Sequence, residues 1–157
     1  MSAGAIAKVH VMLALIQRVT EATVRVDQQI VGAIGPGLLA LVAVQPGDGD
    51  PQVARMAERL LGYRVFADAD GRLNLSLADT GGGLLLVSQF TLAADTGSGM
   101  RPGFSSAAPP ELAEPVFNHL LQTCRARHEA GVESGRFGAH MLVSLVNDGP
   151  ATFLLRA

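Results

Sequence analysis

The chain has 157 residues, of which 48% are hydrophobic and 17% charged, and its net charge is −2. This length and composition exclude a disordered chain and predict one domain with one hydrophobic core. The near-neutral charge lacks the excess of basic residues typical of nucleic-acid-binding proteins, so an RNA partner is expected to make few, local contacts. Cys124 is the single cysteine, which excludes an intramolecular disulfide. No hydrophobic run reaches the roughly 18 residues of a membrane span.

The first third of the chain has the patterns of consecutive strands. Hydrophobic runs and alternation of polar with hydrophobic residues both indicate extended structure. Gly35-Pro36-Gly37 breaks the chain before the most hydrophobic of these segments. Short links between consecutive strands favour antiparallel pairing. The predicted strands are Met12–Thr20, Ala22–Val26, Ile30–Ile34 and Leu38–Val44.

A helix and a hairpin are predicted next. Asp50-Pro51 is typical of a helix N-terminus, and the helix is expected to end near Gly62. Asp70-Gly71 lies between two short hydrophobic segments, Val65-Phe66 and Leu73–Leu75, and this pattern predicts a β-hairpin.

The stretch from Leu84 to Leu92 has the most distinctive pattern in the chain. Its four leading hydrophobic residues follow three glycines and predict a strand buried on both faces. Ser88, Gln89 and Thr91 come next, and an unpaired hydroxyl or amide inside a protein costs about 1–3 kcal/mol. These three side chains are therefore expected either to bond to the backbone or to line a pocket.

A long loop, a second helix and two strands are predicted for the rest of the chain. The loop spans Ala93–Pro110, a length typical of functional or mobile segments. The helix is expected over Glu111–Ala130, before Gly131. Its predicted buried face consists of Leu112, Val116, Leu120 and Cys124, with Phe117 and Leu121 beside them. The two strands, Met141–Val146 and Ala151–Leu155, flank Gly149-Pro150.

These elements predict a single mixed α/β domain. Mostly antiparallel sheets are expected to form a barrel-like β/β/α arrangement of layers, with two helices on one side. The domain is expected over residues 12–157, with residues 1–11 as an N-terminal extension.

Two motifs resemble the signatures of the D-aminoacyl-tRNA deacylase family: Ser88-Gln89-Phe90-Thr91-Leu92 and Asn147-Asp148-Gly149-Pro150-Ala151-Thr152. Further matching pieces occur in order between about Met12 and Leu155: Leu15–Val19, Ile34–Leu38, Arg101-Pro102 with Phe104, Ala107–Pro110 and Gly135–Gly138. The resemblance implies a cytoplasmic homodimer that hydrolyses the ester bond of D-aminoacyl-tRNA, and of glycyl-tRNA mischarged on tRNA(Ala). It implies neither a metal nor an organic cofactor.

The resemblance also implies roles for individual residues. Gln89 and Thr91 are the catalytic candidates, with Thr91 first a pocket residue and second a nucleophile. In the favoured mechanism water attacks the ester, assisted by the 2′-hydroxyl of the terminal adenosine. The implied substrate-binding residues are Ser88, Phe90, Phe104, Met141, Gly149 and Pro150.

In this family the Gly-Pro bond is cis and enters the active site of the neighbouring subunit. Its carbonyls hold the substrate's amino group and leave no room for an L side chain, so selection is by exclusion. Gly149 and Pro150 occupy these positions here, and Arg18 matches the arginine that braces the motif. The segment Asp95–Arg101 departs from the family pattern because it lacks several basic residues, which weakens the expectation of phosphate contacts there.

Other chemistries have little support in the residues. The four histidines lack metal-ligand spacing. Ser88 lies in no G-x-S-x-G motif and has no sequence partner of a serine triad. Two further hypotheses stay open: a non-catalytic module that binds a nucleotide or amino acid, and an editing relative with a trans Gly-Pro bond that accepts an L-aminoacyl-tRNA.

Overall fold

The computed structural model describes residues 11–157, so residues 1–10 of the predicted extension lie outside the described part. The elements follow one another in this order: β1 Leu13–Val26, β2 Gln29–Ile34, β3 Gly37–Ala43, α1 Asp50–Gly62, β4 Phe66–Ala67, β5 Leu73–Leu75, α2 Leu77–Thr80, β6 Gly83–Ser88, the 3₁₀ helix η1 Phe90–Ala93, α3 Pro110–Arg127, β7 Val132–Ser134 and β8 Leu142–Arg156.

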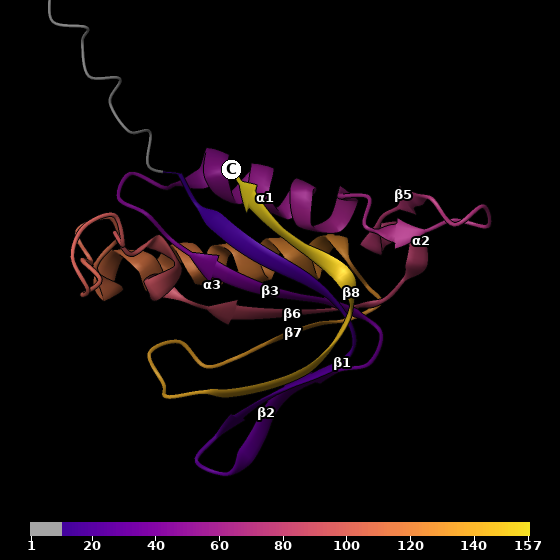
Figure 1. Ribbon diagram of the computed structural model, residues 1–157, viewed down its shortest axis with the longest axis horizontal. Helices are drawn as coiled ribbons and strands as arrows, with labels where there is room; N and C mark the ends of the chain where they lie inside the picture. Colours follow the sequence, from indigo (N-terminus) through magenta and orange to yellow (C-terminus); the bar gives the residue numbers. More distant parts are fainter. Residues whose placement is uncertain (1–10) are drawn as a thin grey trace, which may run out of the picture.

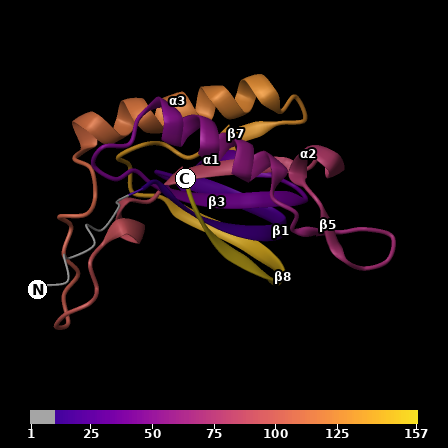
Figure 2. The same ribbon diagram turned by 90° about the horizontal axis from the view of Figure 1, so that it is seen from above.

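Within the described residues, six strands form one mixed sheet in the order β2-β1-β3-β6-β7, and β8 also pairs with β1. β1 is antiparallel to β2, β3 and β8, whereas β6 is parallel to β3 and β7. Helices α1 and α3 lie on the same side of the sheet, while β2 and the first half of β8 curl over the other side (Figures 1 and 2). The predicted mixed, barrel-like α/β fold is confirmed, and the parallel pairs are an addition to it.

The long strand β1 contributes to two separate cores. Ala14 and Ile16 pack into the core beneath the helices, whereas Val19, Ala22 and Val24 pack into a second core on the opposite face. The β1–β8 register shifts between Gln17 and Val19 and again between Val19 and Glu21. An irregularity of this kind bends a strand and re-aims its side chains. The sheet can therefore curl into a nearly closed barrel.

The glycines before β6 allow its close approach to β3. Gly37 is the register partner of Gly83, and a Cβ on Gly37 would collide with the backbone of Gly83. Gly81 has a φ of 69° and ends α2. Glycine is therefore needed here both for the turn that ends α2 and for the packing of β6 against β3. Beyond it, Leu84–Val87 is fully buried, as predicted for a strand covered on both faces.

Several predicted details are changed by the structure. The short helix α2 adds to the two predicted helices, and its Ser76 N-cap accepts a hydrogen bond from Asp79 N at 3.2 Å. The two predicted C-terminal strands are one irregular strand, β8. On α3, Leu112 is 60% exposed, so its predicted burial is wrong. The buried residues of this helix are Ala113, Phe117, Leu120, Leu121 and Cys124.

Candidate active site

A cavity of about 780 Å³ lies where the parallel strands β3 and β6 end. In open α/β sheets, ligands commonly bind at the carboxyl ends of such strands. The walls come from β3, β6, the first residues after β6, the loop before α3, α3 itself and the segment before β8. The lining residues are Val42, Val44, Val87, Ser88, Gln89, Phe90, Phe104, Ser105, Ala107, Ala108, Pro109, Pro110, Ala113, Phe117, Phe137, Gly138, Ala139, His140, Met141 and Val143.

Most of this lining is hydrophobic, and two aromatic pairs contribute to it. Phe117 and Phe137 have ring centroids 6.0 Å apart, and Phe117 is almost completely buried. Phe90 and Phe104 have centroids 5.5 Å apart and are 57% and 47% exposed. One pair therefore belongs to the inner wall and the other to the mouth. Such exposed aromatic surface suits the flat face of a ligand ring.

Polar groups follow β6 at one edge of the cavity. Ser88 ends β6, and Gln89 follows with its backbone amide donating to the carbonyl of Val42 at 2.7 Å. The Gln89 Nε2 donates to Thr91 Oγ1 at 2.6 Å. Thr91 is exposed and does not line the cavity itself. Ser88 and Gln89 therefore line the cavity, whereas the Gln89 side chain bonds to the Thr91 side chain rather than to the backbone.

The backbone at this edge has amides that point to no helical partner. Phe90 and Thr91 begin η1, and the first amides of a helix have no acceptor within the helix. Free amides near an ester can stabilise the oxyanion that forms on attack. The amide of Gln89 differs from these two because it is already bonded to Val42.

Asp48 fixes the loop after β3, next to the cavity. Its carboxylate accepts hydrogen bonds from the amides of Gln45 at 2.8 Å and Met12 at 3.1 Å. Burial raises the pKa of Asp48, while the two amides oppose the shift. This carboxylate is therefore a structural tie between β1 and the end of β3.

The Gly149–Pro150 motif lies in a different part of the molecule. Val19 pairs with Asn147 and Gln17 with Thr152, so the motif lies opposite Arg18 on β1. Val42, at the end of β3 in the cavity wall, pairs with Ala14. Four residues of strand separate the two rows, or about 13 Å at about 3.3 Å per residue. Neither Gly149 nor Pro150 lines the cavity of its own chain.

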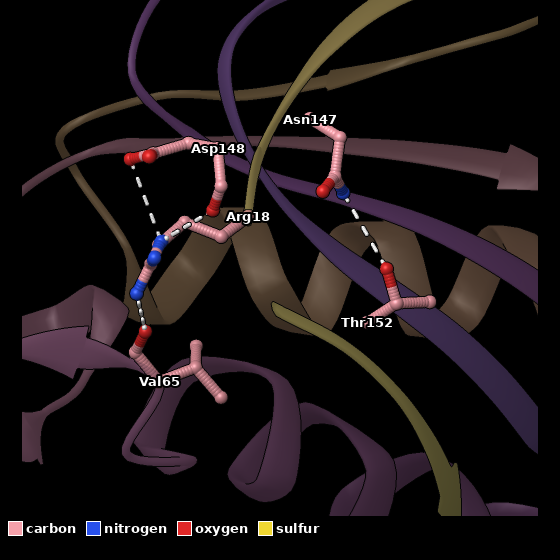
Figure 3. Close-up of polar contacts among 5 residues, drawn as sticks. All are labelled: Arg18, Val65, Asn147, Asp148 and Thr152. Carbon is pink, nitrogen blue, oxygen red and sulfur yellow. Dashed lines mark hydrogen bonds and ion pairs between the residues drawn. The ribbon is translucent and has the colours of Figure 1, made fainter. Parts of the chain in front are cut away.

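Arg18 holds the backbone of this motif in place (Figure 3). Its Nε donates to the carbonyl of Asp148 at 2.8 Å, and its Nη1 donates to the carbonyl of Val65 at 2.8 Å. The Asp148 carboxylate lies 3.4 Å from the same Nε. The Gly149–Pro150 bond is cis, as the resemblance implies, and residues 147–150 are all exposed.

The structure thus sorts the predicted site residues into two groups. Ser88, Gln89, Phe90, Phe104 and Met141 surround one cavity, whereas Arg18, Gly149 and Pro150 lie together elsewhere. The sequence analysis missed Phe117, Phe137 and His140 as cavity residues. Phe137 was signalled by the Gly135–Gly138 match, but Phe117 and His140 belong to patterns shared with ordinary core and surface residues.

No cluster of three or more metal-ligating side chains occurs among residues 11–157. In the same part of the chain, no helix is long and apolar enough to cross a membrane. A hydrophobic cavity with a few convergent polar groups, at the ends of parallel strands, defines a ligand site of the kind found in α/β enzymes.

Comparison with known proteins identifies the family. The family model described as D-Tyr-tRNA(Tyr) deacylase matches residues 15–156, and the chain belongs to this family of hydrolases. Similar relatives named D-aminoacyl-tRNA deacylase occur in Xanthomonas axonopodis pv. citri (strain 306) and Stenotrophomonas maltophilia (strain K279a). They are 74% and 71% identical to this chain, over 92% of it and 99% of their own length.

Solved structures have the same fold. One named c-Myc DNA Unwinding Element Binding Protein has a TM-score of 0.87 and 36% identity, and the match covers 92% of this chain and 98% of that one. Another is described as a probable eukaryotic D-amino acid tRNA deacylase. It has a TM-score of 0.81 at 15% identity, with 93% and 99% covered, and shows likeness of fold alone.

Proposed function

We propose that this chain hydrolyses the ester bond between a D-amino acid and the terminal adenosine of its tRNA, releasing the free D-amino acid and the tRNA. Glycine mischarged on tRNA(Ala) is a second substrate in this proposal, because selection by exclusion does not reject a residue without a side chain. The observation that carries the proposal is family membership with 74% identity to a D-aminoacyl-tRNA deacylase over 92% of the chain. The enzyme would act in the cytoplasm and use no metal or organic cofactor.

The cavity would hold the terminal adenosine. Its hydrophobic walls suit the base, and Phe104 at the mouth offers a ring for packing against adenine. Met141 also lines the cavity, while Ser88 and Gln89 lie at the edge that follows β6. The ester would then lie near Gln89 and η1, where the amides of Phe90 and Thr91 are suited to stabilise the oxyanion.

Water would be the nucleophile, with the 2′-hydroxyl of the terminal adenosine assisting. A threonine hydroxyl needs a base to become a nucleophile. Thr91 receives its hydrogen bond from the Gln89 amide, which is not a base. Thr91 is therefore assigned to holding Gln89 in place rather than to covalent catalysis.

A partner subunit would complete the site. The Gly149–Pro150 motif is exposed, lies about 13 Å along β1 from the row of the cavity residue Val42, and does not line the cavity of its own chain. In a two-fold symmetric dimer, the motif of each subunit can enter the cavity mouth of the other, giving two equivalent sites. Its carbonyls would hold the amino group of a D substrate and exclude an L side chain, and Arg18 would keep the motif in position.

The test is deacylation of D-Tyr-tRNA and L-Tyr-tRNA in parallel assays. Rapid loss of the D ester with survival of the L ester supports the proposal. Loss of neither ester, together with measurable nucleotide binding, would favour the non-catalytic binding module. Rapid loss of the L ester would contradict the proposed selection. Sedimentation at nanomolar concentration tests the dimer separately, and a fully active monomer would overturn the shared site.

A further inference from the structure

The cavity lining contains one side chain that can carry a positive charge. Among the described residues that line it, His140 is the only titratable one, and the rest are hydrophobic, hydroxyl or amide residues or glycine. His140 is exposed and directly precedes Met141 at the cavity wall. Histidine gains a positive charge as pH falls between about 8 and 5. The charge of the cavity rim is therefore controlled by one residue.

The substrate of the proposed function, on which this inference rests, carries a fixed anion close to the reacting ester. This anion is the 5′-phosphate that joins the terminal adenosine to the preceding nucleotide. The hydrophobic inner wall suits the base, but an anion buried there without a partner would be strongly unfavourable. The phosphate must therefore remain at the rim, where a cationic donor and water can both reach it.

We propose that protonated His140 binds the 5′-phosphate of the terminal adenosine at the cavity rim. The other cationic side chains close to it in the chain or near the mouth do not line the cavity. Arg136 lies in the same turn, where its carbonyl accepts a hydrogen bond from Ala139 N at 3.2 Å, and Arg101 lies in the loop before Phe104. His140 is thus a substrate-binding residue. A single contact of this kind fits a chain with a net charge of −2.

A binding measurement tests the contact without relying on catalysis. Adenosine and the methyl ester of adenosine 5′-monophosphate are titrated into the wild-type protein and His140→Gln at pH 6 and pH 8. The methyl ester keeps one negative charge over this range, as the phosphodiester of tRNA does. The wild type should bind the ester about three- to tenfold more tightly than adenosine at pH 6, and the preference should shrink at pH 8. The His140→Gln variant should show no preference at either pH.

Kinetics with D-Tyr-tRNA provide the second readout. His140→Gln should raise KM about three- to tenfold at pH 6 and leave kcat unchanged. The substrate's amino group titrates with both enzymes, so the ratio of their KM values isolates His140. His119→Gln is the matched control, because His119 lies on α3 beside Asp50 and outside the cavity.

Three results would overturn this inference: an equal loss of adenosine and ester binding, no difference between wild type and His140→Gln, or a fall in kcat at constant KM. The last result would indicate that His140 acts in the chemistry instead. A wild type that binds the ester as expected but does not deacylate D-Tyr-tRNA would contradict the proposed function and leave the phosphate contact standing.

Discussion

The cavity and the Gly149–Pro150 motif differ in almost every physical property. The cavity is concave and mostly hydrophobic, and its walls come from several elements that also build the two cores. The motif is an exposed irregularity within β8, and one side chain, Arg18, ties its backbone to two other parts of the fold. The cavity can bind a ligand but has little to distinguish its handedness. The motif has backbone carbonyls to offer but no pocket.

In the proposed function, this difference is the reason why one chain provides two half-sites. A cavity lined by core residues is fixed by packing, and packing needs neighbours on all sides. The Gly149–Pro150 motif must instead face outwards to reach a partner, so its position must come from a few directed hydrogen bonds. The cost is dependence on Arg18, because the carbonyls of Asp148 and Val65 both rely on it.

Gly149→Ala should have the largest effect on activity, because it changes the motif and leaves the cavity untouched. A Cβ at this position would collide with the Asn147 side chain and lie 2.8 Å from the Ala151 amide. The motif must shift, and misplacement by about 1 Å costs catalysis on the order of 100-fold. D-Tyr-tRNA deacylation measures the loss. Gly35→Ala is the matched control, since its Cβ meets nothing within 4 Å, and full activity of Gly149→Ala would contradict the role of the motif.

Arg18→Gln should have a smaller effect that reaches both stability and activity. The change removes the donors to the carbonyls of Asp148 and Val65, and the Arg18 side chain is only 17% exposed. The loss should lower the free energy of unfolding by about 1–3 kcal/mol. A loosened motif should reduce kcat/KM for D-Tyr-tRNA about tenfold, or roughly 1.4 kcal/mol. Chemical denaturation and kinetics are measured together with Arg25→Gln, an exposed residue of the same strand. Equal behaviour of the two variants would show that Arg18 is not a brace.

Thr91→Ala addresses the cavity edge and should reduce kcat less than about tenfold, because it removes one hydrogen bond that orients Gln89. Thr123→Ala, which removes an exposed hydroxyl bonded to the His119 carbonyl, is the control. A complete loss of activity in Thr91→Ala, with fold and nucleotide binding intact, would point to a covalent role for Thr91.

Substitution of Cys124 should alter neither the cavity nor the Gly149–Pro150 motif, although Cys124 lies on α3, which contributes to the cavity wall. Burial raises the pKa of its thiol to about 12, so the folded protein keeps the neutral thiol where the unfolded chain ionises from about pH 9. Stability should therefore fall as pH rises from about 9 towards 12, because the unfolded state loses this proton first. Denaturation curves at pH 8 and 10 should show a smaller fall for Cys124→Ala than for the wild type. Alkylation of the folded wild type at pH 8 should be slow, and rapid alkylation would contradict the burial.

Sequence patterns predicted the buried strand beside the cavity, while only the family resemblance implied that the motif serves a different subunit. Leu84–Val87 was recognisable as a buried strand because four hydrophobic residues between glycines and polar residues have few other solutions. The hairpin at Asp70-Gly71 was predicted from its turn residues and is present as β4 and β5. Local patterns of this kind depend on neighbours in the chain, so they can be read without the fold.

Other features depended on contacts that local patterns do not encode. Leu112 fits the predicted face of α3, but the helix turns Ala113 and Phe117 inwards because the core lies on that side. The parallel pairing of β6 with β3 and β7 follows from the crossovers through the helices rather than from the strand sequences. The distance between Gly149 and the cavity follows from strand register, whereas the resemblance implied only that the motif serves the neighbouring subunit.

A mixed dimer tests the shared site most directly. One subunit carries Gly149→Ala, and the other carries Ala107→Trp, which places a bulky side chain on the cavity wall. Each variant alone should form a dimer with little activity. In the mixed dimer, the intact cavity of the first subunit can receive the intact motif of the second, so about half of wild-type activity per dimer should return, from one of its two sites. A mixed dimer as inactive as its two parents would contradict a site built from both chains.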